Sequence, residues 1–241
     1  MEKDTRNEEM SNIPRHIGFV PDGNRRFAKR LMINPWKGHE FGAQKVRKLL
    51  YWCKDIGVHE LTLFAFSLDN FHRPPEEFTF LMNLFEREFS ALKESKEIFD
   101  EKLQINFIGR IDLFPERIVK IMEELMNLTK DHDGFIVNFA MAYGGRAEII
   151  DAARRLAEDV ERGVLPADHI TEKAFQQYLG LKTNVDMIIR TGGEKRTSGF
   201  LLWQGEYSEL FFVDKLWPEF EKEDFLYCIE EFKHRQRRFG C

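Results

Sequence analysis

Pro21-Asp22-Gly23-Asn24-Arg25-Arg26 directly follows the short apolar run His16–Val20. An apolar run that ends at Asp-Gly-Asn predicts a buried strand that stops at a turn, and the segment from Arg25 to Leu31 can form a helix. In open α/β sheets, ligands bind at the carboxyl ends of the strands. Asp22 can therefore hold a divalent cation, while the turn N–H groups and the two arginines can hold phosphate oxygens. On this stretch alone, a turn with solvated arginines is an equal alternative.

The rest of the chain repeats this pattern of an apolar run, turn residues and a helical segment. Strands are predicted at residues 16–20, 61–66, 103–108, 135–140, 185–189 and 209–213, and helices at 25–31, 39–56, 74–97, 114–128, 147–162, 171–179 and from 222 onward. Strands that alternate with helices predict an α/β fold with a central, mostly parallel six-stranded sheet flanked by helices. No linker or repeat interrupts the pattern, so residues 13–241 are predicted to form a single domain after a polar, disordered lead-in at residues 1–12.

The composition limits the classes of protein that the chain can belong to. Its 241 residues are 43% hydrophobic and 32% charged, which suits one soluble domain with a real core. A formal net charge of −5 does not favour general binding of nucleic acid, so an anion site has to be a local cluster of Arg and Lys. Three widely spaced cysteines form no metal-binding pair, and no apolar run approaches ~18 residues. These features predict a cytoplasmic protein without structural zinc or a membrane span.

Charged and polar residues follow three of the predicted strands at their carboxyl ends. They are Asp22, Asn24 and Arg26 after the first strand, Asn70 and Arg73 after the second, and Arg190, Glu194, Arg196 and Ser198 after the fifth. In a parallel sheet these ends lie on one edge, so the residues can converge. Arginines, a hydroxyl group and glycine-rich turns suit a diphosphate, and a single aspartate with phosphate oxygens is the usual way to hold Mg²⁺. Two such clusters indicate two diphosphates, and hence the joining of two amphiphilic substrates.

An ordered set of motifs gives the chain a resemblance to a known family. The motifs are His16…Asp22-Gly23-Asn24-Arg25-Arg26, Gly38-His39, Phe66-Ser67…Asn70-Phe71…Arg73-Pro74, Ala142-Tyr143-Gly144-Gly145-Arg146, Arg190-Thr191-Gly192-Gly193-Glu194-Lys195-Arg196-Thr197-Ser198, Phe200-Leu201-Leu202-Trp203-Gln204, Tyr207-Ser208-Glu209-Leu210 and Leu216-Trp217-Pro218. Their order and spacing, from about His16 to Gly240, resemble the cis-prenyltransferases, the family of undecaprenyl and dehydrodolichyl diphosphate synthases. Each piece alone is unspecific, but the ordered set is highly specific.

The resemblance implies a Mg²⁺-dependent condensation of isopentenyl diphosphate with an allylic prenyl diphosphate, such as farnesyl or geranylgeranyl diphosphate, to make a cis-polyprenyl diphosphate. It implies catalytic roles for Asp22 and Asn24 and metal binding by Asp22 and Glu209, the latter near a homodimer interface. It assigns the allylic diphosphate to Gly23, Asn24, Arg25, Arg26, His39, Ser67, Asn70 and Arg73, and isopentenyl diphosphate to Arg190, Arg196 and Ser198. The proton acceptor stays unassigned, because Asn24 is a poor base.

Some of these residues also have simpler interpretations. His39 by itself suits a satisfied surface position, and Glu209 suits a cap or an ion pair before a strand. Arg238-Phe239-Gly240 is either the solvated end of a helix or a tail that reaches the site of a partner subunit. Several residues depart from the family pattern; among them, Arg25 adds a cation to the loop, and Pro35 stands where an arginine is frequent.

The chain contains 23 phenylalanines, and core packing is the ordinary explanation of so many aromatic side chains. If helix 74–97 lines a product tunnel, as the resemblance implies, then Phe78, Phe80, Phe85 and Phe89 narrow it. Phe80 is then the expected determinant of a short or medium product.

Two other functions stay open at this point. One is a non-catalytic partner subunit of a cis-prenyltransferase, although such a subunit could lose the strand-end residues that are present here. The other keeps the enzyme but changes its chemistry, to irregular coupling of two allylic units or transfer to a non-isopentenyl acceptor. The sequence has no hydrophobic anchor, so any membrane contact is expected to be peripheral.

Overall fold

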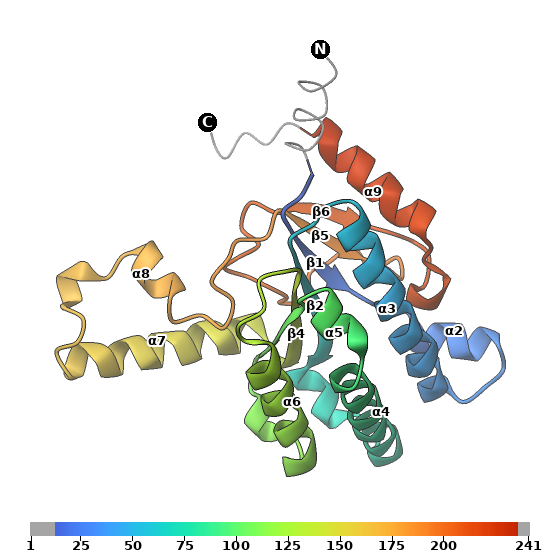
Figure 1. Cartoon of the computed structure of the whole chain (residues 1–241), viewed down its shortest axis with the longest axis horizontal. Helices are drawn as coiled ribbons and strands as arrows, with labels where there is room; N and C mark the ends of the chain where they lie inside the picture. The colour runs from blue at the N-terminus through green and yellow to red at the C-terminus, as the bar shows by residue number, and fades with distance from the viewer. Residues whose placement is uncertain (1–12, 236–241) are drawn as a thin grey trace.

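One parallel sheet organises the computed structural model, which describes residues 13–235; the predicted lead-in at 1–12 and the motif Arg238-Phe239-Gly240 lie outside this range. Six strands are paired in the order β3-β4-β2-β1-β5-β6, and every pairing is parallel (Figure 1). The strands are β1 His16–Val20, β2 Glu60–Ser67, β3 Gln104–Ile108, β4 Ile136–Tyr143, β5 Met187–Arg190 and β6 Glu209–Phe212. The α/β class and the six-stranded sheet are confirmed, and the sheet is fully rather than mostly parallel.

Helices and short 3₁₀ turns connect the strands and cover the sheet. The α-helices are α2 Asn24–Arg30, α3 Gly38–Asp55, α4 Pro75–Lys93, α5 Lys96–Asp100, α6 Glu116–Thr129, α7 Gly145–Glu161, α8 Glu172–Gln176 and α9 Lys222–His234. The 3₁₀ turns are η1 Pro35–Lys37, η2 Leu68–His72, η3 Ile111–Leu113, η4 Ala167–His169 and η5 Trp217–Glu219. No helix among residues 13–235 is long and apolar enough to cross a membrane.

Strand β1 lies near the middle of the sheet, and all five of its residues are buried. It is hydrogen-bonded to β2 on one side and to β5 on the other, with Val20 in register with Arg190. The carboxyl ends of β1, β2 and β5 are therefore neighbours on one edge of the sheet, which is where an open α/β fold binds its ligands. The turn at residues 21–26 stands at the centre of that edge.

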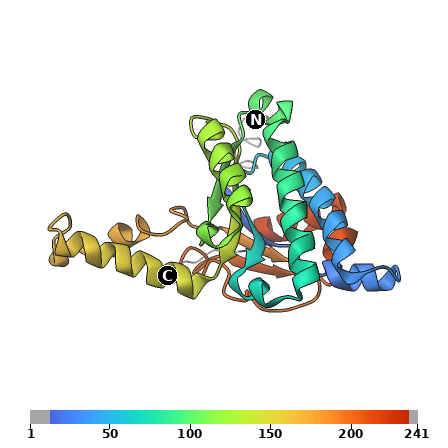
Figure 2. The same cartoon turned by 90° about the horizontal axis from the view of Figure 1, so that it is seen from below.

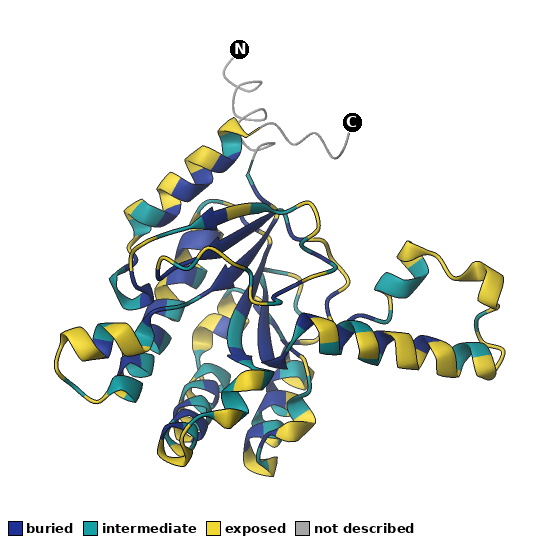
Figure 3. Ribbon diagram, turned by 180° about the vertical axis from the view of Figure 1, so that it is seen from behind, coloured by how far each residue is buried: buried dark blue, intermediate teal, exposed yellow. Residues whose placement is uncertain are grey.

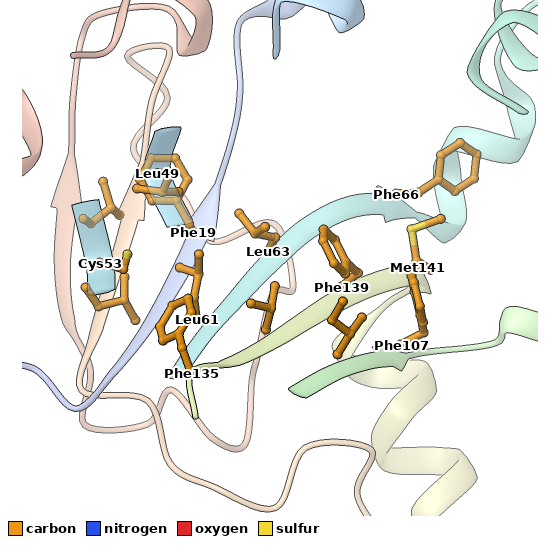
Figure 4. Packing of buried hydrophobic residues seen from close by; sticks show 14 of the residues in the cluster. Phe19, Leu49, Cys53, Leu61, Leu63, Phe66, Phe107, Phe135, Phe139 and Met141 are labelled. Carbon is orange, nitrogen blue, oxygen red and sulfur yellow. The ribbon is translucent and has the colours of Figure 1, made fainter. Parts of the chain in front are cut away.

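The two faces of the sheet are covered differently. Ile17 and Phe19 belong to the main core, which helices α3, α4, α6 and α9 close (Figures 2 and 4). The alternate residue Gly18 faces the segment that follows β5, where a β-carbon on Gly18 would lie 3.1 Å from the Phe200 ring. Only the start of α7 is joined to the sheet, and the helix then extends away from it with most of its surface exposed (Figures 2 and 3).

Several predicted boundaries differ from the structure, and the hydrogen bonds explain two of the differences. The predicted helix 74–97 is divided into α4 and α5, because the Ser95 hydroxyl accepts a hydrogen bond from the Glu97 N–H and caps a new helix. Strand β4 continues to Tyr143, three residues beyond its predicted end, because Met141 and Tyr143 still pair with β2. The short helix with a Thr171 cap is confirmed.

Candidate active site

The Asp22 carboxylate lies between two arginines at the end of β1. Its Oδ2 accepts a hydrogen bond from Arg190 Nη2 at 2.8 Å, and its Oδ1 accepts one from Arg26 Nη2 at 3.1 Å. Thr191 fixes the backbone of the same residue: its Oγ1 accepts from the Asp22 N–H at 3.0 Å and donates to the Asp22 carbonyl at 2.9 Å. Because Thr191 is fully buried, the ends of β1 and β5 are held together as one unit.

Arg190 is a buried cation with a donor still to satisfy. Its side chain is 6% exposed, and Nη1 donates to Ser198 Oγ and to the Arg196 carbonyl, each at 2.7 Å. Arg190 Nε has no hydrogen-bond partner, although it is buried. A buried donor without an acceptor costs free energy, so this atom fits an anionic ligand that supplies an oxygen.

Glu77 joins two arginines and a histidine that come from different segments of the chain. Its side chain is 1% exposed, and Oε1 accepts from Arg73 Nη1 at 2.9 Å and lies 3.3 Å from His39 Nε2. Its Oε2 lies 3.8 Å from Arg25 Nη1. The carboxylate therefore holds together side chains from α2, α3 and the start of α4. Sequence reasoning missed Glu77, whose only signal is its position four residues after Arg73 at the beginning of a helix.

His39 is neutral at physiological pH. Burial, together with the positive charge of Arg73, lowers the pKa of the imidazole from its ordinary 6.5 to about 4. Arg73 Nη1 lies 3.2 Å from His39 Nε2. Burial also lowers the pKa of Arg73, and the Glu77 carboxylate opposes that shift. The site therefore combines charged arginines with an uncharged imidazole that can donate or accept one hydrogen bond.

Asn24 presents an unsatisfied amide oxygen to the same region. Its Oδ1 is buried and has no hydrogen-bond partner, while Nδ2 donates to the Pro21 carbonyl at 3.5 Å. Gly42 on α3 makes room for it, because a β-carbon on Gly42 would lie 2.4 Å from Asn24 Oδ1. Arg190 Nε, Asn24 Oδ1 and Gln204 Oε1 are the three unsatisfied buried side-chain atoms in the described part of the chain. Two of them thus lie at this edge of the sheet.

Two polar cavities open at the carboxyl edge. The first, which we call the basic cavity, has a volume of about 390 Å³ and is lined by residues 21–26, Lys29, His39 and Arg73. The second, which we call the polar cavity, has a volume of about 190 Å³. Its predicted site residues are Asp22, Asn24, His39, Ser67, Asn70, Arg73, Arg190 and Ser198. The structure therefore brings together side chains from the ends of β1, β2 and β5, as the sequence predicts.

A third cavity is apolar and runs between α3 and α4. It has a volume of about 140 Å³, begins at Pro21, Asn24 and His39, and ends near Leu50 and Leu92. A smaller cavity of about 40 Å³ shares Arg47, Leu50 and Leu92 with it and continues to Lys54. Since an α-helix rises 1.5 Å per residue, the stretch of α3 from His39 to Lys54 is about 23 Å long. Pro21, Asn24 and His39 line all three large cavities, so the anionic and apolar sites share one junction.

Several predicted residues lie elsewhere or act differently. The Arg196 guanidinium pairs with Glu194 at 2.5 Å, so only its carbonyl contacts Arg190. Asn70 Oδ1 accepts from the Ser67 N–H at 3.1 Å and caps η2, although both residues line the polar cavity. Among the described residues, Phe80 packs partly buried against the core and does not line the apolar cavity. The prediction that Phe80 narrows a tunnel is wrong; Phe85 and Phe89 are the phenylalanines of α4 at that wall.

Glu209 is not brought to Asp22 within this chain. It begins β6, where it is in register with Met187, and its carboxylate pairs with Arg235 at 2.7 Å. Asp22 follows Val20, which is in register with Arg190 at the other end of β5. Because each residue advances a strand by about 3.3 Å, Met187 and Arg190 are well separated along β5. The Glu209 and Asp22 carboxylates therefore lie on opposite edges of the sheet, at the amino and carboxyl ends of the strands. Within a single copy of the chain, Asp22 and Glu209 are therefore not brought together, and metal binding by each of them stays a prediction.

The fold and the site define an α/β protein in which two polar cavities adjoin an apolar one. A family model described as undecaprenyl diphosphate synthase matches residues 20–240. The chain is 46% identical over 95% of its length to a tritrans,polycis-undecaprenyl-diphosphate synthase (geranylgeranyl-diphosphate specific) of Methanopyrus kandleri, of which it covers 85%. It is 47% identical over 95% of its length to an isoprenyl transferase of Thermus thermophilus, of which it covers 89%.

A solved structure is also similar over nearly the whole chain. It is the lavandulyl diphosphate synthase of Lavandula x intermedia in complex with dimethylallyl diphosphate, with a TM-score of 0.89 and 32% sequence identity. The likeness covers 96% of this chain and all of that one. The chain therefore belongs to the undecaprenyl diphosphate synthase family of cis-prenyltransferases, and it is a transferase.

Proposed function

We propose that this protein is a Mg²⁺-dependent cis-prenyltransferase that condenses isopentenyl diphosphate with an allylic prenyl diphosphate to make a cis-polyprenyl diphosphate. The proposal rests on one observation: Asn24 and His39 line the basic cavity, the polar cavity and the apolar cavity alike. A molecule with a diphosphate head and a hydrocarbon tail fits the basic and apolar cavities together. The polar cavity leaves room for a second diphosphate beside the first.

The cationic side chains of the basic cavity and of the polar cavity allow each substrate to be assigned to one of them. Arg25, Arg26 and Arg73 line the basic cavity, so the allylic diphosphate is assigned there with its tail between α3 and α4. Arg190 and Ser198 line the polar cavity, and the free Nε of Arg190 suits a phosphate oxygen of isopentenyl diphosphate. The shared wall at Asp22 and Asn24 keeps the two heads adjacent, which holds the reacting carbons in contact.

The residues present fit Mg²⁺ held jointly by protein and substrate. Among residues 13–235, no group of three or more His, Cys, Asp or Glu side chains is gathered as a metal site. The Asp22 side chain is 30% exposed at the wall of both polar cavities, so one carboxylate is available beside the diphosphate oxygens. Mg²⁺ commonly binds through one or two carboxylates and substrate phosphates. When bound there, it would neutralise charge that develops on the departing diphosphate.

The chain's own residues then support an ionisation followed by an attack. The allylic carbon–oxygen bond breaks, and the departing diphosphate gains charge that Arg25, Arg26 and Arg73 stabilise. The double bond of isopentenyl diphosphate attacks the allylic cation, and one proton leaves the new chain. Asn24 is at the junction of the cavities but cannot serve as a base at neutral pH, so the departing diphosphate is the candidate acceptor.

The names of relatives guide the choice of substrates to test. One relative is specific for geranylgeranyl diphosphate, and one similar structure holds dimethylallyl diphosphate. The purified chain is therefore incubated with Mg²⁺, isopentenyl diphosphate and each primer in turn: dimethylallyl, farnesyl or geranylgeranyl diphosphate. Mass spectrometry that finds products longer by isopentenyl units supports the proposal. Products that form from two allylic molecules alone would instead establish irregular coupling, and no turnover with any pair would favour the partner-subunit alternative.

We also propose that the chain forms a homodimer through the side of the sheet that ends with β6. This strand is an edge, and Tyr207, just before it, and Leu210, within it, expose 55% and 37% of their surfaces. An exposed edge strand with apolar neighbours is a common place for association. Light scattering at micromolar concentration would return the mass of two chains, and the mass of one chain would refute this part.

A further inference from the structure

Helix α2 ends in a backbone conformation that favours glycine, yet the residue there is Met32. Ile33 N–H donates to the Ala28 carbonyl and Met32 N–H donates to the Lys29 carbonyl, each at 3.1 Å. These two bonds form a Schellman motif, in which the residue after the helix cap is left-handed and is usually glycine. Met32 has a φ of +55°. A side chain with a β-carbon is strained in that conformation.

The strained methionine gains no packing in return, because it is 94% exposed. Leu31 beside it is 47% exposed, and Phe41 on α3, which contacts the Phe27 ring at a centroid distance of 5.2 Å, is 40% exposed. We call Leu31, Met32 and Phe41 the apolar tip. Leu31 and Met32 follow the end of α2, in a loop that projects away from the sheet, and Phe41 is in the first turn of α3 (Figures 1 and 3). The folded chain offers no packing that offsets the strain at Met32, so its side chain is available for a contact outside the chain.

Positive charge surrounds the apolar tip. Residues 24–41 contain five cations (Arg25, Arg26, Lys29, Arg30 and Lys37) and one acidic residue, Glu40, whereas the whole chain has a net charge of −5. Arg25, Arg26 and Arg30 lie 3.8, 3.1 and 2.9 Å from the carboxylates of Glu77, Asp22 and Glu219, and Glu40 lies 3.5 Å from Arg87. Among residues 13–235, no carboxylate pairs with Lys29 or Lys37, and both are exposed. Unpaired lysines beside exposed apolar side chains are the pattern of a segment that lies on an anionic lipid surface.

We infer that the apolar tip inserts into an anionic membrane leaflet while Lys29 and Lys37 contact the lipid headgroups. Lys29 links this surface to the site, because it precedes the tip by two residues and also lines the basic cavity. The basic cavity therefore lies next to the proposed membrane-binding surface. If the proposed function holds, an amphiphilic diphosphate enters and leaves beside the bilayer; the docking itself does not depend on that function.

The test measures binding of the purified chain, without substrate, to vesicles of phosphatidylglycerol and phosphatidylcholine in equal amounts. Met32→Gly is expected to lower vesicle affinity about tenfold, because one inserted methionine is lost. Its melting temperature is expected to stay the same or rise, because glycine relieves the left-handed strain. Lys37→Gln is expected to weaken binding and to reduce its dependence on salt. Matched controls are Val164→Ser, whose side chain is 67% exposed at the far end of α7, and Lys182→Gln.

Three outcomes would overturn the inference. The first is equal vesicle binding by the wild-type chain and Met32→Gly, and the second is equal binding to vesicles made only of phosphatidylcholine. The third is a change of oligomeric state in Met32→Gly by light scattering, since the tip would then contact a second copy of the chain. Activity with short, water-soluble primers is expected to be unchanged in Met32→Gly, which separates docking from catalysis.

Discussion

Arg190 Nη2 lies 2.8 Å from Asp22 Oδ2, so the carboxylate at the end of β1 is fixed by a buried guanidinium from the end of β5. Arg26 holds the other carboxylate oxygen from α2. Asp22 therefore has a defined orientation before any ligand arrives. Its two cationic neighbours also mean that a metal ion binds there more readily together with a diphosphate than alone, because the added phosphates supply negative charge.

Asp22→Asn keeps the shape and one acceptor oxygen but removes the charge. We expect kcat/KM to fall by at least about 100-fold, which corresponds to roughly 3 kcal/mol of transition-state stabilisation. The initial rate is measured across a Mg²⁺ titration. Near-normal turnover at saturating Mg²⁺ would remove Asp22 from the metal site. Thermal unfolding serves as the control that the variant retains the native fold.

Glu77→Gln tests the carboxylate that joins Arg73, His39 and Arg25. Removal of one charge from a buried ionic cluster is expected to lower the free energy of unfolding by about 2–4 kcal/mol. We also expect KM for the allylic diphosphate to rise about tenfold with a smaller change in kcat, because the cations lose their fixed positions. The matched control is Glu76→Gln on the exposed side of the same helix turn. A stable Glu77→Gln variant with unchanged KM would show that the cluster is dispensable.

Because the pKa of His39 is lowered in the folded state, we expect the free energy of unfolding to fall in acid. Burial and Arg73 lower its pKa from 6.5 to about 4 in the folded state, so the unfolded chain binds a proton first as the pH falls. Stability from this residue is complete above pH 6.5 and is lost as the pH falls toward 4, by up to about 3 kcal/mol. Urea unfolding at several pH values is compared between the wild-type chain and His39→Gln. The two curves should converge in acid, and parallel curves would contradict the prediction.

Gly42→Ala separates helix propensity from packing. Alanine favours an α-helix over glycine by about 1 kcal/mol, so the local sequence alone predicts stabilisation. The structure predicts the opposite, because the new β-carbon would lie 2.4 Å from Asn24 Oδ1 and 3.0 Å from the Trp217 ring. We expect a loss of about 1–3 kcal/mol and a lower kcat. In an Asn24→Ala background, Gly42→Ala should cost less stability, and equal costs in both backgrounds would argue against the contact.

Phe85→Ala tests the wall of the apolar cavity. Phe85 lines that cavity and stacks on Phe89 at a centroid distance of 5.6 Å, so its removal creates space between α3 and α4. We expect a shift toward longer products in chromatography of the polyprenyl chains. Phe80→Ala is the matched control, since Phe80 is on the same helix but does not line this cavity. Longer products from Phe80→Ala and unchanged products from Phe85→Ala would reverse the assignment.

The sheet and the cationic edge were predictable because they follow from local signals. Each apolar run stops at turn residues, and parallel strands place their carboxyl ends together, so Asp22 and Arg190 could be expected to meet. However, the polar residues at the start of a strand look the same in the sequence as those at its end. Glu209 is the first residue of its strand and therefore lies at the opposite edge, where it pairs with Arg235.

Whether the remaining residues reach the site depends on how the helices pack against one another. The hydrophobic periodicity of the sequence does not reveal that packing. Glu77 is buried only because α4 brings it against Arg25 of α2 and His39 of α3. Gly42 matters only because Asn24 packs on it, and Phe80 differs from Phe85 only in the direction each faces on α4. The division of the predicted helix 74–97 has a local cause, a serine that caps a new helix, but such a serine is common in exposed helices as well.

The pairing of β1 with β5 also affects how the protein is made. Asp22 and Arg190 are separated by 168 residues, so at about 5–20 residues per second their synthesis is on the order of 10–30 s apart. Throughout that time β1, which is buried along its whole length in the finished sheet, lacks one of its two neighbours. Non-local pairing of this kind slows folding and leaves an apolar strand open to aggregation. The growing chain completes the pair of Asp22 and Arg190 only late in its synthesis, when β5 takes its place beside the first strand.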